Sequence, residues 1–429
     1  MPTPELHEVV IDDLTQDGQG VATVAGERVF VADVLPGETV TISVGKRRRK
    51  LRQGQLHTVI SASPERTTPG CEYFGRCGGC GLQHLEPAAQ LGWKSKAMLE
   101  TLRRIGGVVP EAVAAPITSK PWRYRRRARL GIKNVTAKGR VLVGFRERAA
   151  SYVTDMQHCE VLAPPFDACL GGLAETLAAC SVASKVPQAE IAVGDDHAAI
   201  VLRVLSDPSN DDCARLLEFG QRWDLDVYLQ PGGLDSVVPL GETRPLLYRL
   251  PEQQIELEFT PIDFIQVNAG VNRAMVTRAL ELLQPIETDR ILDLFCGLGN
   301  FTVPLARQAD QVLGMEGAAN LVERARVNGR RNGVDNIEFV TADLNDPAAL
   351  PKQRFDLVLL DPPRTGAAAM VERISSVKPR RILYISCHPG TLARDSAVLY
   401  AQGFELSTAV AVDMFPHTNH VETMALFIA

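Results

Sequence analysis

Several common features are missing from this sequence, and each absence narrows what the protein can be. No apolar stretch reaches the roughly 18 residues that a membrane-spanning helix needs. Residues 1–10 carry acidic side chains and lack the basic and then apolar pattern of a secretion signal. Basic residues are not in excess, with 46 Lys and Arg against 51 Asp and Glu, so local basic patches would have to hold any polyanion. We therefore expect a cytoplasmic protein without membrane contact.

A disulfide framework is not expected either. The nine cysteines are an odd number in a long chain, and no secretion signal accompanies them. Clustered cysteines in a reducing compartment are more often metal ligands or catalysts. One cluster is present, formed by Cys71, Cys77 and Cys80, while Cys387 stands alone near the end of the chain.

The length of 429 residues predicts two or three domains, which we place at 1–62, 63–260 and 261–429. The first contains five short stretches of strand character between glycine turns and is typical of a small closed barrel. The second mixes strands with a helix over residues 86–105. The third alternates strands and helices, which predicts an α/β fold with a parallel sheet and one antiparallel edge strand. The five barrel strands are expected at residues 6–11, 20–24, 28–31, 39–44 and 55–60.

A glycine turn in the third domain indicates a nucleoside-binding site. Residues 292–301 read as a strand, a turn with Gly297 and Gly299, and the start of a helix. Glu316 ends the next strand, where a carboxylate can accept both ribose hydroxyls, and Asp343 could bind an adenine amino group. A dinucleotide site would have a third glycine where Thr302 stands. This departure fits a cofactor without a pyrophosphate, namely S-adenosylmethionine.

Reactive residue types follow the late strands of the same domain. Cys387 comes directly after an apolar strand, Glu422 ends the polar stretch 413–422, and Asp361 ends another strand. Methylation of uracil at carbon 5 needs this combination, because a thiolate must add to carbon 6 and a base must later remove the carbon 5 proton. His417 and His420 are competitors for the role of base, although a structural role is the commoner one for such histidines.

These segments resemble the RNA uracil-5-methyltransferase family over nearly the whole chain. The resemblance rests on residues 264–268, 293–301, 385–395 and 413–422. It implies a class I, Rossmann-like methyltransferase domain with Cys387 as nucleophile and Glu422 as the proton-abstracting base. His388 is a departure, because the family usually has Asn there. The residues implied to contact the cofactor are Gln266, Phe295, Asn300, Glu316, Asp343 and Asp361, the last also near the uracil.

The cysteine cluster predicts a metal centre. Cys71, Cys77 and Cys80 lie so close in sequence that their thiolates would repel one another without a bound metal. By spacing alone zinc is as good an interpretation as iron. The family resemblance implies that Cys159 completes a four-cysteine site for a [4Fe-4S] cluster, with a structural rather than a redox role.

Two basic segments and the barrel indicate RNA as the partner, and no protein partner is implied. The barrel resembles the TRAM domain, an OB-like RNA-binding module, and ends in the basic residues 46–52. Residues 123–129 form the second basic segment, with Trp122 and Tyr124 as possible stacking platforms. Family members with both barrel and cluster include the enzyme for uridine 1939 of 23S ribosomal RNA, which is the target that we expect. The alternatives are transfer RNA, a small molecule or DNA, and an RNA-binding ribosome-assembly factor without activity.

Overall fold

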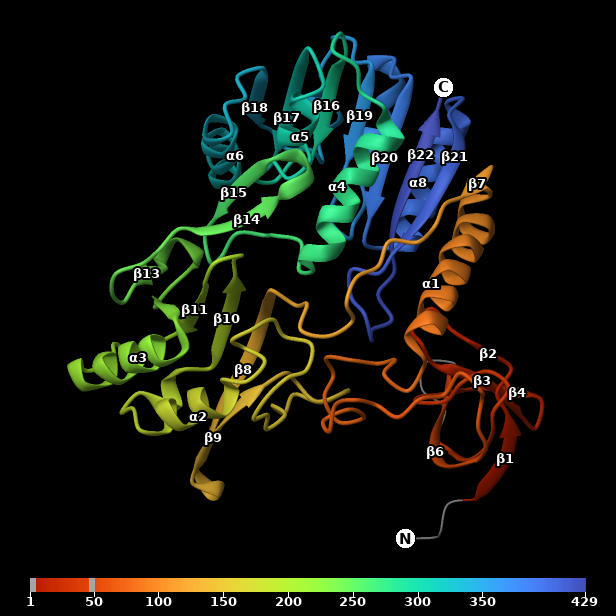
Figure 1. Cartoon of the computed structure of the whole chain (residues 1–429). Helices are drawn as coiled ribbons and strands as arrows, with labels where there is room; N and C mark the ends of the chain where they lie inside the picture. The colour runs from red at the N-terminus through yellow and green to blue at the C-terminus, as the bar shows by residue number, and fades with distance from the viewer. Residues whose placement is uncertain (1–4, 46–50) are drawn as a thin grey trace.

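A computed structural model describes residues 5–45 and 51–429, and its strands form four sheets. Figure 1 shows a small N-terminal sheet at the lower right, a second sheet at the lower left and a large α/β sheet at the top. Among the described residues, no helix is both long and apolar enough to cross a lipid bilayer.

The N-terminal sheet has six strands in the order β1-β5-β6-β4-β3-β2 and encloses its own core of valine and isoleucine side chains. Ala25 and Gly26 both have positive φ and make the tight turn between β3 and β4. All five predicted strands are confirmed, and the short β2 is additional. Of the basic segment 46–52, residues 46–50 lie outside the described residues. The strands are β1 Leu6–Val10, β2 Asp13–Leu14, β3 Gly20–Val24, β4 Glu27–Val31, β5 Thr39–Val44 and β6 Arg52–Ser61.

The central sheet also has six strands, in the order β13-β12-β11-β10-β8-β9, and two helices cover it. Ser209 and Asp212 form a capping box that starts the second of these helices. The strands are β8 Arg127–Val135, β9 Arg140–Gly144, β10 Gln188–Val193, β11 Ala198–Arg203, β12 Leu225–Gln230 and β13 Val238–Pro239, and the helices are α2 Leu170–Ala178 and α3 Asn210–Trp223.

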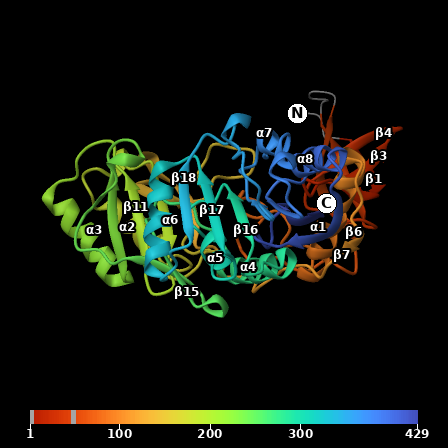
Figure 2. The ribbon, with the colours of Figure 1, turned by 90° about the horizontal axis from the view of Figure 1, so that it is seen from above.

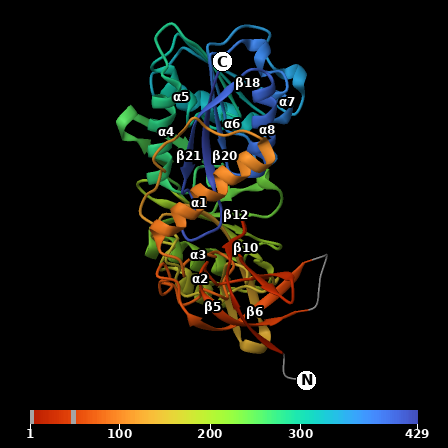
Figure 3. The same cartoon turned by 90° about the vertical axis from the view of Figure 1, so that its right-hand side faces the viewer.

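The helix predicted over residues 86–105 is present, but it belongs spatially to the large sheet. Helix α1 spans Pro87–Thr101, continues as one π-helical turn over Leu102–Gly106, and contacts strand β21 (Glu405–Val412). Figure 3 shows α1 lying across the molecule beside this strand. A side chain at Gly106 would meet the carbonyl oxygen of Ala393 at 2.6 Å, so only glycine allows this close approach.

The large sheet has the order β18-β17-β16-β19-β20-β22-β21-β7, with β22 antiparallel to both of its neighbours. The prediction that the antiparallel strand lies at the edge of the sheet is therefore wrong, because β21 and β7 (Ala112–Val113) lie between β22 and that edge. A hairpin of β14 and β15 precedes this sheet. The strands are β14 Leu246–Leu250, β15 Ile255–Phe259, β16 Arg290–Leu294, β17 Gln311–Glu316, β18 Ile337–Thr341, β19 Leu357–Leu360, β20 Arg381–Ser386 and β22 Glu422–Ile428.

Helices cover both faces of the large sheet, as the alternating pattern predicts. In Figure 2, α4 and α5 lie on one face and α7 and α8 on the other. Each pair contributes to a separate apolar core, so the strands between them are buried on both sides. The helices are α4 Ala269–Leu283, α5 Thr302–Ala306, α6 Ala319–Arg331, α7 Ala368–Val371 and α8 Pro389–Ala401.

Candidate active site

A cavity of about 520 Å³ opens where the parallel strands of the large sheet end, which is where ligands bind in open α/β sheets. Its volume lies within the range of roughly 300–1,000 Å³ that is common for small-molecule sites. All eight residues that the sequence singled out for catalysis or cofactor contact line it. They are Gln266, Phe295, Asn300, Glu316, Asp343, Asp361, Cys387 and Glu422.

The glycine turn after β16 forms one wall of the cavity. Phe295, Gly297 and Gly299 all have positive φ, and the turn therefore exposes its backbone to the cavity. Glu316 is fixed beside it, because its carboxylate accepts hydrogen bonds from the Gly297 N–H at 3.2 Å and the Ala318 N–H at 3.0 Å. This arrangement suits a ribose whose hydroxyls donate to a carboxylate.

Asn300 is held by two residues that sequence reasoning missed. Its amide pairs reciprocally with the amide of Asn272 from α4, at 2.9 Å in each direction. The Tyr248 hydroxyl, from strand β14, donates to the same Asn300 oxygen at 3.0 Å. Neither residue stands in a motif, and only the packing of the hairpin and α4 against the turn brings them to Asn300.

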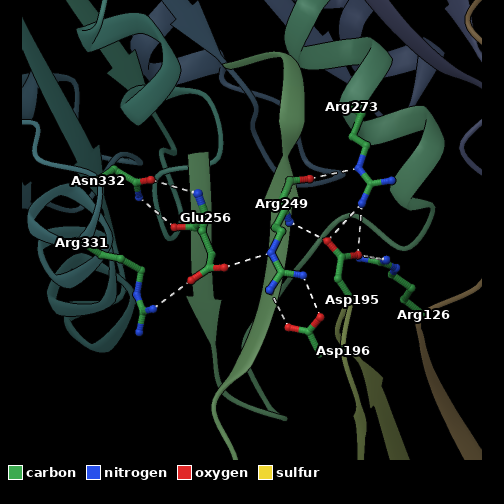
Figure 4. A network of polar contacts seen from close by, with 8 residues as sticks. All are labelled: Arg126, Asp195, Asp196, Arg249, Glu256, Arg273, Arg331 and Asn332. Carbon is green, nitrogen blue, oxygen red and sulfur yellow. Dashed lines mark hydrogen bonds and ion pairs between the residues drawn. The ribbon is translucent and has the colours of Figure 1, made fainter. Parts of the chain in front are cut away.

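Charged side chains anchor the hairpin that carries Tyr248 (Figure 4). Arg249, the next residue, bonds Asp196 in the β10–β11 turn at 2.6 Å and Glu256 in β15 at 3.0 Å. Arg273 from α4 bonds Asp195 at 3.0 Å. Arg273 also donates to the Arg249 carbonyl at 3.0 Å, so the hairpin is tied both to the central sheet and to helix α4 of the large sheet.

The opposite wall of the cavity carries the reactive groups. Cys387 follows β20, Glu422 begins β22, and Asp361 follows β19, where its carboxylate accepts a hydrogen bond from Gln266 Nε2 at 3.3 Å. Burial raises the pKa of Asp361 to about 7. Burial, and then the nearby Asp361, raise the pKa of Glu422 to about 8. Burial and the charge of Glu422 raise the pKa of the Cys387 thiol to about 11. Carboxyl groups that titrate near neutrality can exchange protons with a substrate.

His388 performs a role for which asparagine is also well suited. It is the N-cap of α8, and its Nδ1 accepts a hydrogen bond from the Thr391 N–H at 3.2 Å. Asparagine is among the best N-cap residues for the same geometric reason. The departure from the family pattern therefore keeps the cap next to Cys387.

The two histidines that competed for the role of base do not line the cavity. His417 is buried, stacks on Trp122 with ring centroids 3.9 Å apart, and receives a hydrogen bond from Gln90 Nε2 on its Nδ1 at 3.3 Å. Burial lowers its pKa to about 4. His420 is exposed on the surface. The structural role that the sequence favoured for His417 is confirmed, whereas Glu422 lines the cavity together with Cys387.

Cys71, Cys77, Cys80 and Cys159 line a second, smaller cavity beside Phe145, the residue that follows β9. Burial raises the pKa of Cys80 to about 11 and that of Cys159 to about 12, and it also raises the pKa values of Cys71 and Cys77. Within residues 5–45 and 51–429, no three His, Cys, Asp or Glu side chains form a ready group for a metal ion. The structure thus brings the four predicted ligands to one place without a preformed ion site.

The basic segment 123–129 is turned largely into the protein, contrary to the expectation that it faces RNA. Arg126 pairs with Asp195, and Arg127 pairs with Glu190. Tyr124 is buried and donates its hydroxyl to the Pro416 carbonyl at 3.1 Å. Of the charged side chains in this segment, Arg123 and Arg129 keep most of their surface exposed.

A solved structure shares this fold over its full length. The tRNA (uracil-54, C5)-methyltransferase of Pyrococcus abyssi, in complex with S-adenosyl-L-homocysteine, superposes with a TM-score of 0.78 at 26% identity. The match covers 98% of this chain and 100% of that one. The fold and the cavity thus define an S-adenosylmethionine-dependent methyltransferase.

Sequence comparison gives the family. Residues 247–429 match the model of the tRNA (Uracil-5-)-methyltransferase family. The 23S rRNA (uracil(1939)-C(5))-methyltransferase RlmD of Alkalilimnicola ehrlichii is 46% identical over 99% of this chain and 96% of its own length. The protein of the same name from Methylococcus capsulatus is 45% identical over 97% and 96% of the two chains. This chain belongs to the RNA uracil-C5-methyltransferase family.

Proposed function

We propose that this protein methylates carbon 5 of a uridine in 23S ribosomal RNA, the one that its relatives' name numbers 1939, with S-adenosylmethionine as methyl donor. Relatives with that name match nearly the whole chain. The observation that carries the mechanism is the single cavity in which Cys387 and Glu422 meet the cofactor-binding turn. Because ribosomal RNA is the substrate, a cytoplasmic location is part of the proposal.

Cys387 starts the reaction as a nucleophile. Its sulfur adds to carbon 6 of the uracil, and the electrons of the 5,6 double bond move into the ring as an enolate. The thiol must lose its proton for this step, and Asp361 lines the same cavity as the acceptor. S-adenosylmethionine, when bound, supplies an electrophilic methyl group to carbon 5.

Glu422 completes the reaction as a base. After methylation, carbon 5 carries both the new methyl group and its original hydrogen. The Glu422 carboxylate removes that proton, the electron pair restores the 5,6 double bond, and the Cys387 thiolate leaves carbon 6. The opening of β22 is a suitable place for this base, because the strand holds Glu422 in the wall that also carries Cys387.

The remaining cavity residues orient the cofactor. Glu316 is placed for the ribose hydroxyls, and Asp343 for the adenine amino group. Asn300 and Phe295 lie on the glycine turn, and Gln266 joins the cofactor side to Asp361 through its hydrogen bond.

The N-terminal sheet forms a TRAM-like barrel that binds RNA in this proposal, and the chain divides at 1–62, 63–260 and 261–429. Separate apolar cores in the N-terminal and central sheets support the division. The contact of α1 with β21 means that part of the second segment folds onto the third.

The four cysteines form the ligand set of a [4Fe-4S] cluster in this proposal. Their thiols share one cavity, and the chemistry of four thiolates fits an iron–sulfur centre as well as zinc. A cluster held by these residues would fix the loop before α1 and bring it onto the central sheet.

Nucleoside mass spectrometry tests the proposed function. Unmodified 23S ribosomal RNA and unmodified transfer RNA are each incubated with the protein and S-adenosylmethionine. New 5-methyluridine should form in the 23S sample and be absent with the Cys387→Ala variant, which should also trap no covalent RNA complex. No product from the wild-type protein in either RNA would leave the ribosome-assembly factor as the alternative.

Transfer RNA is the second candidate substrate. The solved structure with a TM-score of 0.78 is a tRNA methyltransferase, and the matching family model has a tRNA description. Product in transfer RNA alone would keep the mechanism and replace the target.

A further inference from the structure

Helix α1 contains a lysine that is buried although nothing in its sequence pattern requires a charge there. The Lys94 side chain is 1% exposed, and it is the one lysine or arginine that is buried among residues whose burial the structure describes. Its Nζ donates to Asp413 Oδ1 at 2.6 Å and to the Phe415 carbonyl at 3.0 Å. A buried ion pair contributes little net stability over apolar residues of the same size, so stability alone does not explain it.

The two acceptors of Lys94 lie in the segment 413–421, which joins β21 to β22 and leads directly into Glu422. One helical turn before Lys94, Gln90 Oε1 accepts a hydrogen bond from the His417 backbone N–H at 2.9 Å. Residues four apart share one face of a helix. This face of α1 therefore holds the segment before Glu422 at both its beginning and its middle.

Glu422 lies among other acids. Asp361 at the end of β19 and Asp413 at the end of β21 both raise its pKa, whereas Lys94 lowers it. Cys387 faces the same cavity, and Arg364 at its exposed rim lowers the pKa of that thiol. Lys94 is thus the buried cation among these groups. Burial lowers the pKa of Lys94 below its usual value, and the negative charges of Asp413 and Glu422 partly oppose that shift.

We propose that Lys94 is a positioning residue for the second half of the reaction: it holds the segment that carries Glu422 and balances the acids around it, so that Glu422 can act as a carboxylate. The proposal rests on the role of Glu422 in the proposed function. Helix α1 precedes the methyltransferase segment in the sequence, and through Lys94 it would take part in releasing the methylated RNA.

The test separates methyl transfer from breakdown of the covalent adduct. Wild-type and Lys94→Met proteins are mixed with S-adenosylmethionine and a 23S fragment containing the target uridine, under single-turnover conditions, across the pH range around 8. Methyl incorporation and the denaturant-resistant complex are followed separately. Lys96→Met is the matched control, because Lys96 lies on the same helix, is exposed, and pairs with Asp13 away from the cavity at 3.0 Å.

We expect Lys94→Met to methylate RNA at close to the wild-type rate and to accumulate the adduct. At neutral pH, adduct breakdown should slow about tenfold or more, since each unit by which the pKa of Glu422 rises cuts its carboxylate fraction about tenfold. Higher pH should restore breakdown, which a purely structural defect would not allow. Adding Asp413→Asn should restore part of the rate by removing one neighbouring acid. Lys96→Met should behave as wild type.

Adduct breakdown in Lys94→Met at the wild-type rate at every pH would overturn the proposal. So would an equal loss of methyl transfer and breakdown that raising the pH does not reverse. A Glu422→Gln variant that accumulates no adduct would instead refute the role of Glu422 itself, and the two failures are thereby distinguished.

Discussion

At the scale of single residues, burial turns ordinary side chains into reactive ones. Glu422 lies 7% exposed at the start of β22, where its backbone pairs with Val412. Burial and the neighbouring Asp361 together raise its pKa to about 8. A carboxylic acid with such a pKa is poised to gain and lose protons near physiological pH, as a general base must.

The Glu422→Gln variant should stop the reaction after methyl transfer. Glutamine keeps the shape of the side chain but cannot accept the carbon 5 proton, so a denaturant-resistant, methylated RNA complex should accumulate. In the wild-type protein, breakdown of the complex should rise with pH through about 8, because Glu422 acts as a base only when ionised. Gel analysis with labelled methyl groups measures both effects. A variant that releases methylated RNA normally would assign the base to another residue.

Sequence reasoning could predict the cavity residues because they stand in local motifs, most of them next to the end of a strand. Cys387 and Glu422 are 35 residues apart in the chain, yet both fall where adjacent strands meet. The residues that it missed act through contacts between distant segments. Lys94 reaches Asp413 across a separation of 319 residues, and Tyr248 reaches Asn300 across 52. Contacts between residues so far apart in the chain leave no local pattern in the sequence.

At the scale of elements, the N-terminus of α8 fixes the position of Cys387, the proposed nucleophile. Cys387 lies between the end of β20 and the N-cap residue His388, so the strand and the helix together fix its backbone. Pro389 at the first helical position also favours this helix start. The backbone position of Cys387 therefore depends on the helix cap, and substitutions of His388 test that cap.

Replacement of the cap should affect stability in a predictable order. His388→Ala removes the acceptor for the Thr391 N–H and should lower the free energy of unfolding by about 1 kcal/mol. His388→Asn restores a cap and should remain close to the wild-type protein. Denaturant unfolding of the three proteins measures the difference. Equal stability of the alanine and asparagine variants would show that the cap contributes nothing.

Element boundaries were predicted best where a pattern is local. The predicted strands 20–24 and 39–44 agree with β3 and β5 at both ends, since glycine turns bound them in the sequence. Helix α5 begins at Thr302, just after the stretch 292–301 in which its start was expected, because Asn300 is held in the turn by Asn272 and Tyr248. Strand order is not local, which is why β22 was expected at an edge although β21 and β7 cover it.

At the scale of the whole molecule, the cysteine loop contacts the segment that leads to the active site. The backbone N–H groups of Gly81 and Leu82, directly after Cys80, both donate to the His417 carbonyl at 2.9 Å. His417 lies in the segment that leads to Glu422. The loop that the four cysteines would hold is therefore part of the support of Glu422, the proposed base, and loss of the proposed cluster should affect the last step of the reaction.

Protein purified without oxygen should be brown and contain about four irons per chain, as a [4Fe-4S] cluster requires. Cys159→Ser removes one of the four thiols that line the cavity and should abolish both the colour and the iron. Cys169→Ser is the matched control, because Cys169 is also buried in the central core but does not line that cavity. The iron-free variant should still methylate RNA but release it more slowly than the control, because its Gly81–Leu82 support for His417 is loosened. One zinc per chain in the wild-type protein would refute the cluster, and unchanged release by Cys159→Ser would separate the cysteine site from catalysis.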